Sequence, residues 1–186
     1  MATRASYGRR ARFGLRAIIR CWPWYYESTA VFRNEVLLRT VPNSIGYYSQ
    51  TMGNWAVNPS AFEPRPIDVD GISLFREDFV TQEYLASVNK HPAGARVARI
   101  TAKELAKLGL SLQPSPDPNG PPGHTVISEM RFTKRTAQNK AQIQKMRDIA
   151  QELAQISSKN EIYAPEGLPD PVAVAKDTTL CRDPED

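Results

Sequence analysis

The clearest local structure signals in this chain lie close together in residues 96–112. Residues 96–100 alternate polar and apolar side chains, which is the period of a strand with one buried and one solvated face. Thr101 and Glu104 follow with the spacing of a capping box, in which each side chain accepts a hydrogen bond from the other residue's amide. Gly109 stands where a helix end favours a left-handed residue. The stretch therefore predicts a strand that runs directly into a helix of about two turns.

A helix this short needs a sheet to lie on, and other stretches supply strands. The connection across the short helix is too short for a parallel crossover, so a mixed or antiparallel sheet is expected. With 186 residues, 41% of them hydrophobic, the chain can bury one sizeable core. The predicted fold class is α+β, with a small sheet in a single domain over residues 30–160. The further candidate strands are 35–41, 72–76, a short stretch with period 2 over 110–112, and 124–127.

The longest predicted helix runs over residues 136–157, with Thr136 as its N-cap. We expect it to cover one face of the sheet and to keep its polar face, with Lys140, Lys145 and Arg147, in solvent. A phosphate-binding or partner-binding polar face is the alternative. A shorter helix is expected after Thr81. The apolar stripe of the long helix consists of Ile143, Met146, Ile149, Ala150, Leu153 and Ile156.

The net charge of +4 is distributed unevenly, because the two ends have opposite charge. Residues 1–29 form a basic arm, with six arginines and no acidic residue among the first 20. Residues 161–186 form an acidic, proline-rich tail. Both ends are expected to be disordered, the tail because it has few large apolar residues to bury. Nucleic-acid contact, a targeting segment and a start codon assigned too far upstream are alternative interpretations of the arm.

Residues 43–67 are predicted to form a long loop, since they are rich in Asn, Ser, Gly, Tyr and Pro and show no sustained period. Loops of this length in small domains are often binding loops or lids. We expect its aromatic residues to tether the loop to the core and to form the surface that binds a partner. These residues are Tyr47, Tyr48, Trp55 and Phe62.

The sequence contains no motif for a phosphate loop, a dinucleotide site, a nucleophile elbow or a zinc protease. Cys21 and Cys181 lie near opposite ends and match neither a disulfide framework nor a metal site, which fits a reducing cytoplasm. No run of about 18 apolar residues is present, so no membrane span is predicted. Neither a cofactor nor a metal is predicted.

One constellation offers an enzymatic alternative. Arg39, Ser73 and Glu129 stand on or beside three predicted strands in the order used by one branch of the ADP-ribosyltransferases. The resemblance implies that Arg39 and Ser73 position NAD and that Glu129 orients the ribose for transfer. The family's Ser-Thr-Ser and Glu-x-Glu patterns are absent here. His124, which opens a predicted strand beside a Pro-Gly loop, is a further candidate base.

A set of short motifs is distributed over roughly residues 36–155. The motifs are LLR followed by Pro42, then PSAF at 59–62, GISL at 71–74, LGL at 108–110, PDP at 116–118 and PGHTVI at 122–127. Together they resemble a loose group of small bacterial proteins that have no established activity. The resemblance implies a bacterial, cytoplasmic protein without indicating any chemistry.

The sequence favours a non-enzymatic accessory protein that binds another protein through the aromatic loop and the proline-rich segment over 114–122. The second hypothesis is nucleic-acid binding, and the third is the NAD-dependent transferase. A cluster of Arg76, Arg99 and His124 on one side of the sheet would indicate an anion site. The partner's identity and the oligomeric state stay open. The basic residues of the nucleic-acid hypothesis are Arg9, Arg10, Arg12, Arg16, Arg20, Lys140, Lys145 and Arg147.

Overall fold

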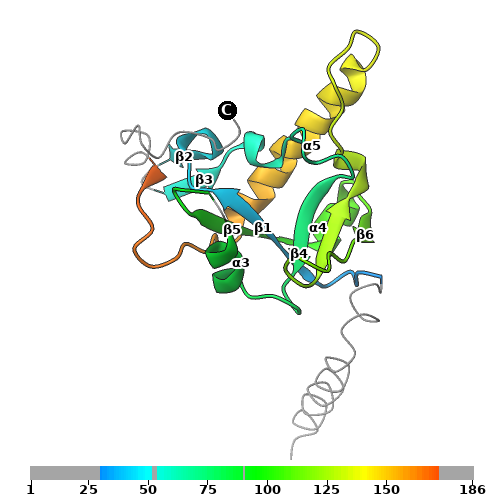
Figure 1. Cartoon of the computed structure of the whole chain (residues 1–186). Coiled ribbons are helices and arrows are strands. Elements are labelled where there is room, and N and C mark those ends of the chain that lie inside the picture. The colour runs from blue at the N-terminus through cyan, green and yellow to red at the C-terminus, as the bar shows by residue number, and fades with distance from the viewer. Residues whose placement is uncertain (1–29, 52–53, 90, 172–186) are drawn as a thin grey trace, which may run out of the picture.

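A five-stranded sheet organises the chain (Figure 1), and the computed structural model describes residues 30–51, 54–89 and 91–171. The strand order is β5-β1-β4-β7-β6, and every neighbouring pair is antiparallel. The predicted α+β domain is therefore confirmed, with an antiparallel sheet. The strands are β1 (Val36–Pro42), β4 (Ile72–Arg76), β5 (Ala95–Thr101), β6 (Leu112–Pro114) and β7 (His124–Ile127).

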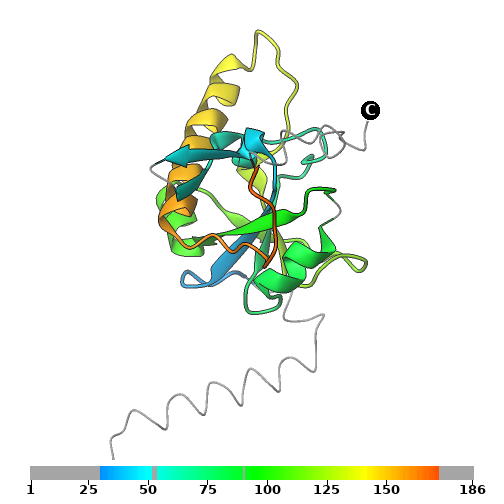
Figure 2. The ribbon, with the colours of Figure 1, turned by 90° about the vertical axis from the view of Figure 1, so that its left-hand side faces the viewer.

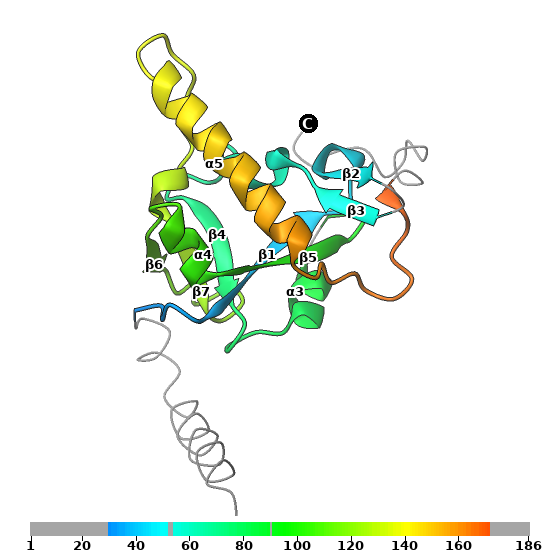
Figure 3. The same cartoon turned by 180° about the vertical axis from the view of Figure 1, so that it is seen from behind.

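The long helix α5 (Lys140–Lys159) covers one face of this sheet (Figure 3). Its predicted stripe is confirmed, since Met146, Ala150 and Leu153 are buried in the main core. The predicted start at Thr136 is wrong, because the helix begins after Asn139. The Asn139 side chain instead accepts from the Thr136 amide at 2.8 Å and so closes the turn that precedes the helix.

The segment between β1 and β4 contains regular structure that the sequence analysis missed. β2 (Tyr48–Thr51) and β3 (Asn54–Val57) pair as a separate antiparallel sheet. The 3-10 helices η1 (Ile45–Tyr47) and η2 (Pro59–Phe62) flank it. The prediction of an irregular loop over 43–67 is therefore wrong. The sequence of β2, YSQT, has one apolar residue followed by three polar ones and therefore shows no alternation of apolar and polar residues.

The predicted capping box and short helices are confirmed. α4 (Ala102–Lys107) begins at Thr101, whose hydroxyl accepts from the Glu104 amide while the Glu104 carboxylate accepts from the Thr101 amide. Gly109 follows α4 with a φ of 71°. α3 (Gln82–Val88) begins after Thr81 and lies on the face of the sheet opposite to α5. The 3-10 helix η3 (Ser128–Met130) follows β7.

The chain after α5 returns along the free edge of β5 (Figure 2). The amide and carbonyl of Tyr163 exchange hydrogen bonds of 2.9 Å with those of Val97. Further on, the Asn43 side chain donates to the Pro169 carbonyl at 2.8 Å. The expectation that the whole tail over 161–186 is disordered is therefore wrong for residues 161–171.

Several predictions fall outside the described residues. They concern the basic arm over 1–29 and the tail over 172–186. Among them are the arm residues of the nucleic-acid hypothesis and both cysteines. These residues are Arg9, Arg10, Arg12, Arg16, Arg20, Cys21 and Cys181.

Candidate functional site

The Arg39 side chain is held inside the fold by backbone carbonyls. Its guanidinium is buried, and it donates to the Ser73 carbonyl at 2.8 Å and to the Ala61 carbonyl at 3.3 and 3.4 Å. Burial lowers the pKa of Arg39 to about 10. Only the backbone of Ser73 takes part, because its side chain lies on the other face of β4 from the core residues Ile72 and Leu74.

Glu129 lies past the end of β7, where it is held by Ser111. The Ser111 hydroxyl donates to the Glu129 carboxylate, and the Ser111 amide does so at 3.1 Å. Partial burial works to raise the pKa of Glu129, but the hydrogen bonds from Ser111, from the Glu129 backbone and from Ser128 together outweigh it and leave the pKa below its usual value. The described residues therefore do not bring the side chains of Arg39, Ser73 and Glu129 together.

His124 was a candidate base and also one of three side chains whose clustering would indicate an anion site. His124 Nδ1 lies 2.6 Å from the Ser115 carbonyl, and its ring is tilted against Phe75 with centroids 5.3 Å apart. Arg99 pairs with Glu77 on the same face of the sheet. Arg76 points to the opposite face, so Arg76, Arg99 and His124 do not cluster on one side of the sheet.

The loop aromatics anchor the fold. Tyr48 and Phe62 are 2% and 0% exposed, and Tyr47 and Trp55 pack against the same core. The predicted tethering is confirmed. The predicted partner-binding role is wrong for Tyr48 and Phe62, because neither has surface left to offer a partner in this structure.

One strongly charged described surface is the basic tip, which we define as residues 131–147. It consists of the segment before α5 and the first turns of that helix, and it projects beyond the sheet in Figures 1 and 2. Its 17 residues include six basic and no acidic ones. All six basic side chains are exposed: Arg131, Lys134, Arg135, Lys140, Lys145 and Arg147.

The charge of the basic tip is almost uncompensated. Arg147 lies 4.0 Å from the Glu63 carboxylate, at the limit of an ion pair. The other five cations form no ion pair with any residue in the part of the chain that the structure describes. Sequence analysis identified three of the six cations and missed Arg131, Lys134 and Arg135. The sequence signal that could have identified them is a run of basic residues without an acid, which continues across the predicted start of the helix.

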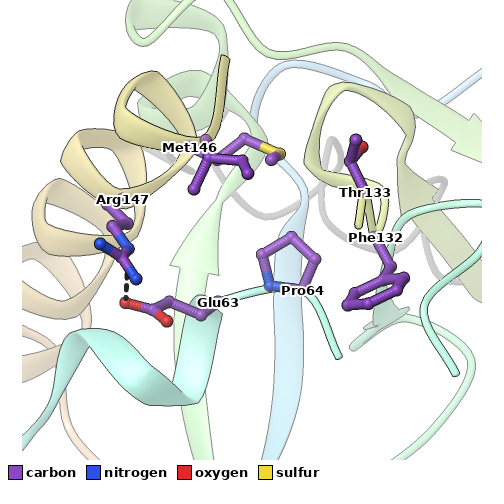
Figure 4. Close-up of a pocket in the computed structure, with 7 residues that line it drawn as sticks. Glu63, Pro64, Phe132, Thr133, Met146 and Arg147 are labelled. Carbon is purple, nitrogen blue, oxygen red and sulfur yellow. Dashed lines mark ion pairs between the residues drawn. The ribbon is translucent and has the colours of Figure 1, made fainter. Parts of the chain in front are cut away.

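Two adjoining depressions shape the tip. A depression of about 380 Å³ is lined mainly by Arg135, Lys140, Gln144 and Arg147. A narrower slot of about 80 Å³ lies beside it (Figure 4). The two share Ile143 and Arg147 of α5, so they form one continuous surface. The slot is lined by Glu63, Pro64, Phe132, Thr133, Ile143, Met146 and Arg147.

A separate groove lies between α3 and the proline-rich segment, on the face away from α5. Its volume is about 430 Å³, and Phe75 and Pro121 are among its lining residues. Tyr84 and Val88 of α3 also line it and are 48% and 40% exposed. An exposed aromatic and an exposed aliphatic side chain on one short helix are features of a contact surface.

Comparison of the chain with protein-family models, curated proteins and solved structures found no match. In residues 30–51, 54–89 and 91–171, no three side chains of His, Cys, Asp or Glu are grouped to hold a metal ion. No helix within these same ranges combines the length and apolar character that crossing a bilayer requires.

Proposed function

We propose that this protein binds nucleic acid through the basic tip. The observation that supports it most is the density of positive charge over 131–147, with six exposed cations and no acid. Five of the six form no ion pair with any described residue, and Arg147 is paired with Glu63 only at 4.0 Å. A polyanion gains from such a surface because each neutralised phosphate releases condensed counterions. Cations with acidic partners nearby would gain less, because binding would first have to break those ion pairs.

The shape of the tip favours a polymer over a small anion. The cations stand on two elements, with Arg131, Lys134 and Arg135 before α5 and Lys140, Lys145 and Arg147 within it. Both elements belong to the end of the molecule that projects beyond the sheet (Figure 3). A chain of phosphates can contact several such cations in succession. The Arg-rich arm of the same chain adds five further candidate contacts, Arg9, Arg10, Arg12, Arg16 and Arg20.

The experiment compares two triple variants of the full chain by fluorescence anisotropy with a labelled 20-nucleotide strand. The tip variant replaces Arg135, Lys140 and Lys145 by Gln. The control replaces the exposed cations Lys103, Lys107 and Lys159 by Gln, which changes the net charge equally and leaves the arm intact. All of these side chains are exposed, so neither variant should unfold.

We expect the tip variant to bind at least ten-fold more weakly and the control to stay within two-fold of the parent. The slope of log K against log salt should fall by about 2 in the tip variant, because three phosphate contacts are lost. Equal losses in the two variants would show that net charge alone matters. No binding by the parent at low salt would refute the proposal.

A second candidate function is binding of another protein at the groove between α3 and the proline-rich segment. It is supported by the exposure of Tyr84 and Val88 along that groove. A pull-down with the Tyr84→Ala/Val88→Ala double variant tests it. We expect the parent to recover a stoichiometric protein after nuclease treatment and the double variant to fail to recover it. Recovery by both proteins would exclude the groove as its site.

A further inference from the structure

We infer that the nucleic acid bound by the basic tip is a single strand, and that one of its bases stacks on Phe132 in the slot beside α5. This inference rests on the proposed function. It adds what the cations alone do not determine, since positive charge attracts single strands and duplexes alike.

The lining of the slot has the composition of a base-stacking site. Pro64 and Phe132 supply two rings, and Met146 reaches over from α5 (Figure 4). Arg147 stands at the slot and also lines the cationic depression. An aromatic face beside basic side chains is the combination with which proteins hold single strands, because the bases stack while the cations bind the phosphates.

The backbone fixes Phe132 in place. Its amide donates to the Asp68 carbonyl at 2.8 Å. Asp68 is buried, and its carboxylate accepts from the Arg65 amide at 2.8 Å, which closes a turn after η2. The ring therefore belongs to a preorganised site, where binding costs less conformational entropy than ordering a free loop would.

The size and charge of the slot restrict what can enter it. Its volume of about 80 Å³ is well below the roughly 300–1,000 Å³ of pockets that enclose small ligands, so only part of a flat group fits. The Glu63 carboxylate at the slot repels a phosphate. The uncharged ring of a nucleotide is therefore the part that enters, with its phosphates on the neighbouring cations. A duplex keeps its bases stacked internally and cannot present a face to Phe132.

The test compares three labelled ligands of equal length with the full-length protein at fixed salt. They are a 12-nucleotide single-stranded DNA, the same backbone with every base removed, and the 12-base-pair duplex. We expect the base-containing strand to bind about five-fold or more tightly than the abasic strand, the factor that stacking of one base provides. It should also bind more tightly than the duplex.

Variants of Phe132 then locate the effect. Phe132→Leu keeps an apolar side chain but removes the aromatic face, so it should lose the preference for bases and keep its affinity for the abasic strand. Phe132→Tyr should retain the preference. Phe32→Leu makes the same change at an exposed phenylalanine outside the tip, so it is the matched control and should behave like the parent.

The outcomes separate this inference from the proposed function. Equal binding of abasic and base-containing strands, or tighter binding of the duplex, would overturn the base-stacking site and leave nucleic-acid binding standing. No binding of any strand would overturn both. The comparison of ligands on the parent protein needs no variant, so a Phe132 change that impairs folding leaves the test decisive.

Discussion

The guanidinium of Arg76 and the carboxylate of Glu35 form a two-point ion pair inside the domain. Arg76 Nε lies 2.6 Å from Oε2 and Nη2 lies 2.7 Å from Oε1, with side chains that are 0% and 8% exposed. The Glu35 carboxylate also accepts from the Phe32 amide at 3.0 Å. The pair ties the residue that precedes β1 to the last residue of β4.

Removing one charge of this pair should destabilise the fold strongly. Glu35→Gln leaves the Arg76 charge buried without its carboxylate, and we expect a loss of about 3 kcal/mol in the free energy of unfolding, measured with urea. The Glu35→Leu/Arg76→Met double variant should recover part of that loss, because neither charge is then buried. A single variant as stable as the parent would show that the pair is dispensable.

Gly71 should tolerate no side chain. Its φ is 132°, and a Cβ placed there would overlap the Ile127 carbonyl across the β4–β7 pair. Gly71→Ala is therefore expected to lower stability by at least ~2 kcal/mol, because backbone must shift. Gly46→Ala is the control, since a Cβ at Gly46 meets nothing within 4 Å. Thermal melting of both variants is the measurement. Similar melting temperatures would contradict the claim that Gly71 tolerates no side chain.

Ser111 should set the pKa of Glu129. Ser111→Ala removes the hydroxyl donor, so the pKa of Glu129 should rise toward its usual value of 4.5. An NMR titration that follows the carboxyl carbon of Glu129 measures this pKa. A carboxylate with a lowered folded-state pKa stabilises the fold above pH 4.5, and that contribution is lost as the pH falls through the lowered value. The variant should therefore lose stability at pH 7 and differ little from the parent below both pKa values. An unchanged Glu129 titration would contradict this.

The capping box at α4 should contribute measurably although the helix has only six residues. Thr101→Ala removes the acceptor for the Glu104 amide, and we expect a loss of about 1 kcal/mol by chemical denaturation. Thr101→Ser keeps the hydroxyl and should lose much less. If both variants lose the same amount, the effect comes from the threonine methyl group and its packing.

Elements that depend on residues within a few positions of each other were predictable. The strand over 96–100, the cap at Thr101 and the left-handed Gly109 are set by alternation, side-chain reach and backbone freedom, all of which are local. The stripe of α5 was predictable for the same reason, since helical periodicity brings i, i+3 and i+7 to one face.

Elements that depend on distant partners were not predictable. The β2–β3 pair is held against α5 by contacts such as the Val57 amide donating to the Ser158 hydroxyl at 3.0 Å, 101 residues away. Residues 161–171 looked unable to join a core, yet Tyr163 completes the edge of β5. Neither the contact between β3 and α5 nor the bridge between Tyr163 and Val97 leaves a recognisable pattern in the sequence of the strand.

The sequence by itself determined the local elements, the fold class and the positive charge around the start of α5. Tertiary structure decided which of the positively charged side chains are exposed to solvent. Arg39 and Arg76 lie on strands and are buried with carbonyl or carboxylate partners, whereas the cations of the basic tip project into solvent. The physical reason is that exposure depends on which face of the sheet a side chain takes and on what covers that face. Both are fixed by contacts between segments far apart in the chain.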